Sequence, residues 1–179
     1  MADADLSARQ AGVAAPCRVA VVDTNVWLDI HFFRDAASQS LAAALESPHW
    51  SAARCEATDA ELAVVLQRAP FGSDPAERCR LLECVRRWQQ RTPLFALCAS
   101  APWRCRDPHD QKFLDLAVAA GAMVLLTKDK ALLAVHRSAQ RDGLMILTPR
   151  QFAERFCGRA SEAPPLPRDP ISLQVRYWR

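Results

Sequence analysis

Short apolar runs alternate along this chain with longer segments whose apolar residues recur at helical spacing. The runs at 18–22, 123–126 and 144–147 are apolar almost throughout. Such runs are typical of strands in a parallel sheet, where both faces of a strand are buried. Two further strands are predicted at 50–53 and 93–97. The pattern therefore predicts a buried, mostly parallel sheet.

Apolar periodicity and capping residues predict helices between these strands. The start signals are clearest where Asp74 precedes Pro75 and where Thr148 precedes Pro149, because proline suits the first turn of a helix. Helices are expected at 26–33, 36–46, 58–69, 75–90, 110–121, 130–139 and 149–157. Since strands alternate with helices, the chain is expected to form an α/β domain.

With 179 residues, the chain has room for one domain and little more. Residues 1–17 are small and polar and are predicted to be a flexible segment, and 158–179 a proline-containing tail. The folded domain is expected at 18–157. The seven scattered cysteines form no metal-binding pattern and predict reduced thiols. With no apolar core for a secretory signal near the start, a cytoplasmic location is expected.

Composition and charge exclude several classes of protein. The five glycines are far apart, so neither a Rossmann dinucleotide loop nor a P-loop can form. The longest nearly apolar stretch, 114–126, is too short to cross a bilayer, and no membrane partner is expected. The formal net charge of +3 permits a nucleic-acid partner without requiring one.

Acidic residues fall where the predicted strands and helices meet. Asp23 directly follows the strand at 18–22, and Asp129 follows the one at 123–126. The carboxyl ends of parallel strands open on one edge of the sheet, which is where such sheets bind ligands. Asp110 begins a helix, and Glu61 is placed in the first turn of another, so both are expected at that edge.

Four carboxylates at one edge would repel each other unless a cation neutralised them. Carboxylate oxygens favour Mg²⁺ or Mn²⁺, ions that commonly bind phosphate oxygens as well. The pattern thus indicates phosphodiester or phosphoryl chemistry. A structural interpretation competes with it for each residue: Asp23, Asp110 and Asp129 are good helix caps, and Glu61 suits a solvated helix position.

Four segments resemble, in order, the motifs of PIN domains. They are VVDTNVWLD at 21–29, TDAEL at 58–62 with its continuation to 71, CRDPHDQKFL at 105–114 with AAGA at 119–122, and LLTKDKALL at 125–133. Within the family, the sequence is most similar to the VapC-like toxin components of toxin–antitoxin systems. The resemblance covers about 18–156 and excludes the tail.

This resemblance implies a Rossmann-like PIN fold, a three-layer α/β/α sandwich around a mostly parallel sheet. It also implies an endoribonuclease dependent on Mg²⁺ or Mn²⁺ that hydrolyses RNA to 5′-phosphate and 3′-hydroxyl ends. An antitoxin protein and a second copy of the chain are candidate partners. The matching motifs assign the metal-binding and catalytic quartet to Asp23, Glu61, Asp110 and Asp129, with Asn25 and Thr127 as supporting residues.

Two assignments within the motifs have close competitors. Glu56 and Asp59 compete with Glu61, although the apolar pattern from 62 to 71 favours Glu61. Asp107 competes with Asp110, but Asp107 precedes a proline and is typical of a turn. Asp29 is interpreted as structural, and Asp115 as a solvated helix residue.

Basic residues beside the motifs are candidates for binding the phosphate backbone. Lys112 and Lys128 lie next to Asp110 and Asp129, and Arg106 lies in the loop before Asp110. The competing interpretation is that such charges are simply solvated. Trp27 could stack on a base, but a core position is favoured.

Two other functions are compatible with parts of this pattern. One is a PIN module that binds RNA or protein without catalysis, although binding alone gives no reason to gather four carboxylates. The other is an aspartate-based phosphotransfer domain in which Asp23 is the nucleophile. Such phosphatases carry a second aspartate two residues later, where this chain has Asn25.

Overall fold

The computed structural model describes residues 17–68, 71, 74–98 and 100–157. Its sheet contains β1 (Arg18–Val22), β2 (Trp50–Ala53), β3 (Val124–Leu126) and β4 (Met145–Leu147). The strands run parallel in the order β2-β1-β3-β4. The predicted parallel sheet is confirmed. The flexible segment predicted at 1–17 lies outside the described residues except for Cys17, and so does the tail predicted at 158–179.

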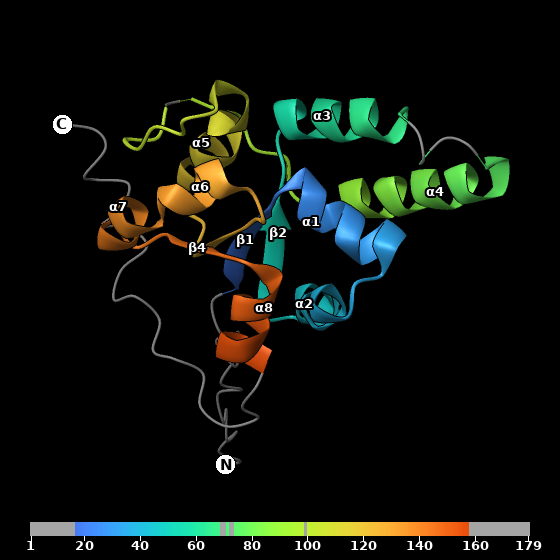
Figure 1. Ribbon diagram of the computed structural model, residues 1–179, viewed down its shortest axis with the longest axis horizontal. Helices are drawn as coiled ribbons and strands as arrows, with labels where there is room; N and C mark the ends of the chain where they lie inside the picture. The colour runs from blue at the N-terminus through green and yellow to red at the C-terminus, as the bar shows by residue number, and fades with distance from the viewer. Residues whose placement is uncertain (1–16, 69–70, 72–73, 99, 158–179) are drawn as a thin grey trace, which may run out of the picture.

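Helices cover both faces of this sheet (Figure 1). On one face lie α1 (Thr24–Leu28), its π-helical continuation η1 (Asp29–Phe33), α2 (Ala36–Glu46), α3 (Glu56–Leu66), α4 (Pro75–Arg91) and α8 (Pro149–Phe152), which continues as the π-helix η3 (Ala153–Cys157). On the other lie α5 (Gln111–Ala119), α6 (Lys130–Ala134) and α7 (His136–Arg141). The predicted α/β/α sandwich is therefore present.

Alternating side chains of the strands build a core on each face of the sheet. In β1, Ala20 and Val22 pack in the core under α1 to α4, whereas Val21 packs in the core under α5. The same alternation separates Leu126 from Leu125 in β3. All of these side chains are buried, as expected for strands covered on both faces.

Several predicted elements differ from the structure. The strand expected at 93–97 is wrong: a single bridge joins Leu94 to Arg54, and the Leu94 side chain is 52% exposed. The helix expected at 130–139 is split into α6 and α7. Helix α3 begins at Glu56, where the Thr58 hydroxyl accepts from the Cys55 N–H at 3.0 Å and donates to the Cys55 carbonyl at 2.9 Å.

No helix within the described ranges has the length and apolar composition that crossing a membrane requires.

Candidate functional site

The register of the sheet brings Asp23 beside Thr127. Val22 pairs with Leu126, and the Asp23 N–H donates to the Leu126 carbonyl at 2.9 Å. The residues that directly follow β1 and β3, Asp23 and Thr127, are therefore neighbours. The Thr127 hydroxyl donates to Asp23 Oδ2 at 2.6 Å. The same hydroxyl oxygen accepts from the Asp129 N–H at 2.9 Å. One threonine thus holds the first and fourth motifs together.

Asp23 is a charged residue in a buried place, with 2% of its surface exposed. Burial, reinforced by the charges of Asp110 and Glu61, raises the pKa of Asp23 to about 6. Hydrogen bonds from the Thr127 hydroxyl and from the Asn25 N–H oppose this rise in pKa. The carboxylate is therefore oriented by two neutral donors, but no cationic side chain among the described residues forms an ion pair with it.

Replacing Asp23 by Asn should stabilise the folded protein at neutral pH in EDTA. The pKa of Asp23 rises on folding from its ordinary 3.8 to about 6, so the unfolded chain releases this proton at lower pH. Folding stability should therefore fall between pH 4 and 6, by about 2–3 kcal/mol in total. Urea unfolding should give equal stabilities near pH 4 and a more stable Asp23→Asn variant at pH 7. An equal stability at pH 7 would contradict the assigned pKa.

Asp110 is the last residue of the short 3₁₀ helix η2 (Pro108–Asp110) and directly precedes α5. Its carboxylate accepts no hydrogen bond from the start of α5, so the capping interpretation does not account for it. Burial raises the pKa of Asp110, and the nearby charges of Asp129, Asp107 and Glu61 raise this pKa further. Together with its effect on Asp23, this puts Asp110 close to all three other members of the predicted quartet.

Asp129 and Asp107 do act as helix caps. Asp129 Oδ1 accepts from the Ala131 N–H at 2.6 Å and the Leu132 N–H at 3.2 Å, at the start of α6. Asp107 accepts from the His109 N–H at 2.9 Å, which caps η2. For Asp129, capping and a role at the acidic edge are compatible, because no described donor bonds to its second oxygen.

Glu61 lies in the second turn of α3, and its predicted place in the first turn is wrong because the helix begins at Glu56. Helix α3 packs against α5, and there the Glu61 carboxylate forms an ion pair with the Lys112 ammonium. The charge of Glu61 raises the pKa of both Asp23 and Asp110. Glu61 is therefore the acid of α3 that joins the others.

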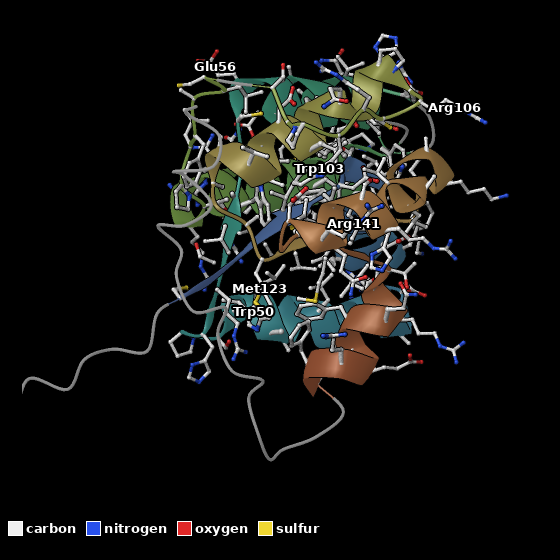
Figure 2. The ribbon with its side chains drawn as sticks, turned by 90° about the vertical axis from the view of Figure 1, so that its left-hand side faces the viewer. Trp50, Glu56, Trp103, Arg106, Met123 and Arg141 are labelled. Atoms are coloured by element: carbon white, nitrogen blue, oxygen red, sulfur yellow. The ribbon has the colours of Figure 1, made fainter. Side chains whose placement is uncertain are left out.

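The two competitors of Glu61 lie elsewhere. Asp59 forms an ion pair with Arg54 at 2.5 Å and lines a small pocket with Trp27 and Trp88 that includes none of the four acids. Glu56 is exposed near the upper end of the molecule in Figure 2. Neither charge contributes to the raised pKa of Asp23.

The predicted supporting and basic residues have different surroundings. Asn25 is exposed, and its backbone N–H, not its side chain, donates to Asp23. Lys128 forms an ion pair with Asp29 at 2.6 Å, which agrees with a structural role for Asp29. Arg106 is exposed near the upper end in Figure 2 and has no ion-pair partner among the described residues. Trp27 is 2% exposed, so its favoured core position is confirmed.

Two polar residues of α5 anchor the loop that carries Arg106. This role was not predicted from the sequence. Gln111 accepts from the Cys105 N–H at 2.9 Å and donates to the Trp103 carbonyl at 3.0 Å. Asp115 accepts from the Ala101 N–H at 2.7 Å, so its interpretation as a solvated residue is wrong. Their spacing of four places both on one helix face, but their partners are backbone groups that no sequence motif marks.

The four acids suit a divalent cation by chemistry and charge. Within the described ranges, no three Asp, Glu, His or Cys side chains converge closely enough to form a finished metal site. The charges of Asp110 and Glu61 nevertheless raise the pKa of Asp23, and those of Asp129 and Glu61 raise the pKa of Asp110. Such repulsion between hard oxygen donors is what a magnesium or manganese ion relieves.

No protein with a curated description matches the sequence. Among solved structures, VapBC2 from Rickettsia felis bound to a DNA fragment from their promoter is 12% identical, with a TM-score of 0.49 over 73% of this chain and 98% of that chain. The PIN domain of T. brucei RRP44 is 15% identical, with a TM-score of 0.37 over 84% of this chain and 89% of that chain.

A sequence match to the PIN domain covers residues 19–131, which is more than half of the chain. The match includes all four acids at the carboxyl edge of the sheet. The strands are parallel, as they must be for the motifs to meet at that edge. This chain belongs to the PIN domain family.

Proposed function

We propose that this protein is a metal-dependent endoribonuclease that hydrolyses phosphodiester bonds of RNA. The observation that carries the proposal is the shared electrostatics of the four acids, which are near enough to raise the pKa values of Asp23 and Asp110. A fold gains no stability from such repulsion. Family membership supports the same conclusion, since PIN domains are generally nucleases.

Asp23, Asp110 and Asp129 are the residues that would hold Mg²⁺ or Mn²⁺, with Glu61 beside them as a ligand of a second ion or an orienting group for water. When bound, such an ion neutralises charge on the phosphate and makes an attacking water more acidic. Thr127 fixes the orientation of the Asp23 carboxylate and, through the Asp129 N–H, of the loop after β3.

Positive side chains beside the acidic edge, Arg106 and Lys128, are proposed to bind the RNA backbone. Arg106 is exposed, and its planar guanidinium can donate two hydrogen bonds to one phosphate. The Lys128 ammonium is half-exposed and pairs with Asp29, so a phosphate would compete for it with that carboxylate. Cleavage is proposed to leave a 5′-phosphate and a 3′-hydroxyl.

The biological role that we propose is that of the toxin of a toxin–antitoxin pair, with an antitoxin protein as a partner and a homodimer as the assembled form. The support is the resemblance of the four motifs to VapC-like toxins. A cytoplasmic location remains a prediction from the sequence. The phosphotransfer alternative is disfavoured because Asp23 is 2% exposed and both of its oxygens accept hydrogen bonds.

A cleavage assay tests this proposal. Single-stranded and structured RNA are incubated with the protein in Mn²⁺, in Mg²⁺ or in EDTA, and the ends of the products are mapped. We expect cleavage in the presence of Mn²⁺ or Mg²⁺ and no cleavage in EDTA. A folded protein that binds neither metal would rule out the metal-dependent nuclease and favour the binding module that lacks catalysis.

A further inference from the structure

Lys112 occupies an unusual place for a positive charge. It is the second residue of α5, and the N-terminus of a helix disfavours cations because of the helix dipole. Its side chain is only 17% exposed, although lysine is ordinarily among the most exposed residues. Something at this position must compensate the ammonium for both costs.

Three groups surround the ammonium. The Glu61 carboxylate of α3 forms an ion pair with Lys112 Nζ, and the His109 carbonyl of η2 accepts a hydrogen bond from it. The ring of Phe113 lies beneath it, with its centroid 4.9 Å from Nζ, which adds a cation–π attraction. The ammonium is thus held by an anion, a carbonyl dipole and an aromatic face.

The supports of this arrangement are themselves fixed. Phe113 is fully buried in the core under α5, and η2, which carries the His109 carbonyl, is capped by Asp107. Glu61 belongs to an eleven-residue helix that packs against α5. The cation therefore has a defined position beside the acidic edge rather than a choice of exposed positions.

The charge of Lys112 reaches beyond its ion pair. It lies two residues from Asp110 and lowers the pKa of that carboxyl, against the raising effects of burial and of neighbouring acids. Glu61 is paired with a cation within the chain, whereas no ion pair with a described residue is found for Asp23, Asp110 or Asp129. These three carboxylates are left to be neutralised from outside.

We propose that Lys112 is a permanent cation of the acidic centre, which holds Glu61 in an ion pair so that Asp23, Asp110 and Asp129 bind a single divalent ion. Lys112 takes the place that a second metal ion would otherwise fill. It is a positioning residue, and this role replaces the binding of RNA phosphate expected for it from the sequence. The inference rests on the proposed function, because it assumes that the site binds a metal.

Manganese binding to the full chain tests this inference without an activity measurement. Isothermal titration gives the number of ions, and the electron paramagnetic resonance of free Mn²⁺ checks it. The wild type should bind one ion. Lys112→Met should bind a second, because Glu61 is then an unpaired carboxylate. Lys112→Arg keeps the charge, and Lys128→Met removes the other lysine of the rim, so both should still bind one.

A double variant covers the case in which Lys112→Met fails to fold. Lys112→Met with Glu61→Gln removes both charges together, which avoids leaving a buried charge without its partner. It should bind one Mn²⁺ with a Kd within about threefold of the wild type, because Glu61 is not a ligand of that ion. A loss of affinity greater than about tenfold would show that Glu61 is a ligand and overturn the inference.

The outcomes separate this inference from the proposed function. A wild type that binds two ions, or a folded Lys112→Met that still binds only one, overturns the inference and leaves the nuclease intact. A folded wild type that binds no Mn²⁺ overturns both.

Discussion

Asp110→Asn should reduce RNA cleavage by more than about a hundredfold without lowering the stability of the fold. The site would lose a carboxylate that is proposed to bind the metal, and a loss of a few kcal/mol in transition-state stabilisation corresponds to two or more orders of magnitude in rate. Stability should be maintained or increased in EDTA, because the carboxylate caps no helix and burial and neighbouring acids raise its pKa. Single-turnover cleavage and thermal unfolding measure the two effects.

Asp107→Asn is the matched control for this prediction. Asp107 lies three residues earlier and caps η2, a task that Asn performs about equally well. Its cleavage rate should stay within about threefold of the wild type. A control that loses as much activity as Asp110→Asn would mean that the third motif had been assigned to the wrong aspartate.

Phe152→Ala should cause the largest loss of stability while the chemistry of the folded protein stays unchanged. Phe152 is fully buried, and its ring lies 5.0 Å from the ring of Trp50 in an edge-to-face contact. Truncating a buried phenylalanine costs about 3–5 kcal/mol, which for a chain of this size lowers Tm by roughly 6–20 °C. Scanning calorimetry in EDTA measures this shift.

The control for this variant is Phe33→Ala, the same substitution at a side chain that is 58% exposed. It should cost less than about 1 kcal/mol. Phe152 is packed with Trp50, which Figure 2 shows near the lower end of the molecule, away from Arg106. Well below the lowered Tm, Phe152→Ala should therefore cleave RNA at the wild-type rate. An unchanged Tm would contradict the packing described for α8.

Local signals were sufficient to predict most of the fold. The bounds of β1, β2 and α2 were predicted as the structure has them, because a strand that is apolar on both faces and a helix ended by Ser47 and Pro48 are both defined by their own residues. The run at 93–97 shows where such signals fail. It is apolar, but whether it becomes a strand depends on a neighbouring edge, and only Arg54, the residue after β2, forms a bridge with it among the described residues.

The acidic edge was predictable because the topology of the sheet determines which residues meet there. In a parallel sheet, residues that follow different strands must meet, so Asp23 and Asp129 could be placed together without knowledge of side chains. The ion pair of Lys112 with Glu61 could not be predicted, since it depends on how α3 packs against α5. For the same reason Asp115, which binds a loop N–H, was mistaken for a solvated residue.

The hydrogen bond from Thr127 to Asp23 joins residues that are 104 positions apart. During synthesis, the first motif leaves the ribosome long before its partner, and β3 must pair with β1 before Asp23 is oriented. A nascent or truncated chain that ends before Thr127 therefore has no assembled centre. For an enzyme that would act on RNA, this order of assembly delays activity until most of the domain has been made and folded.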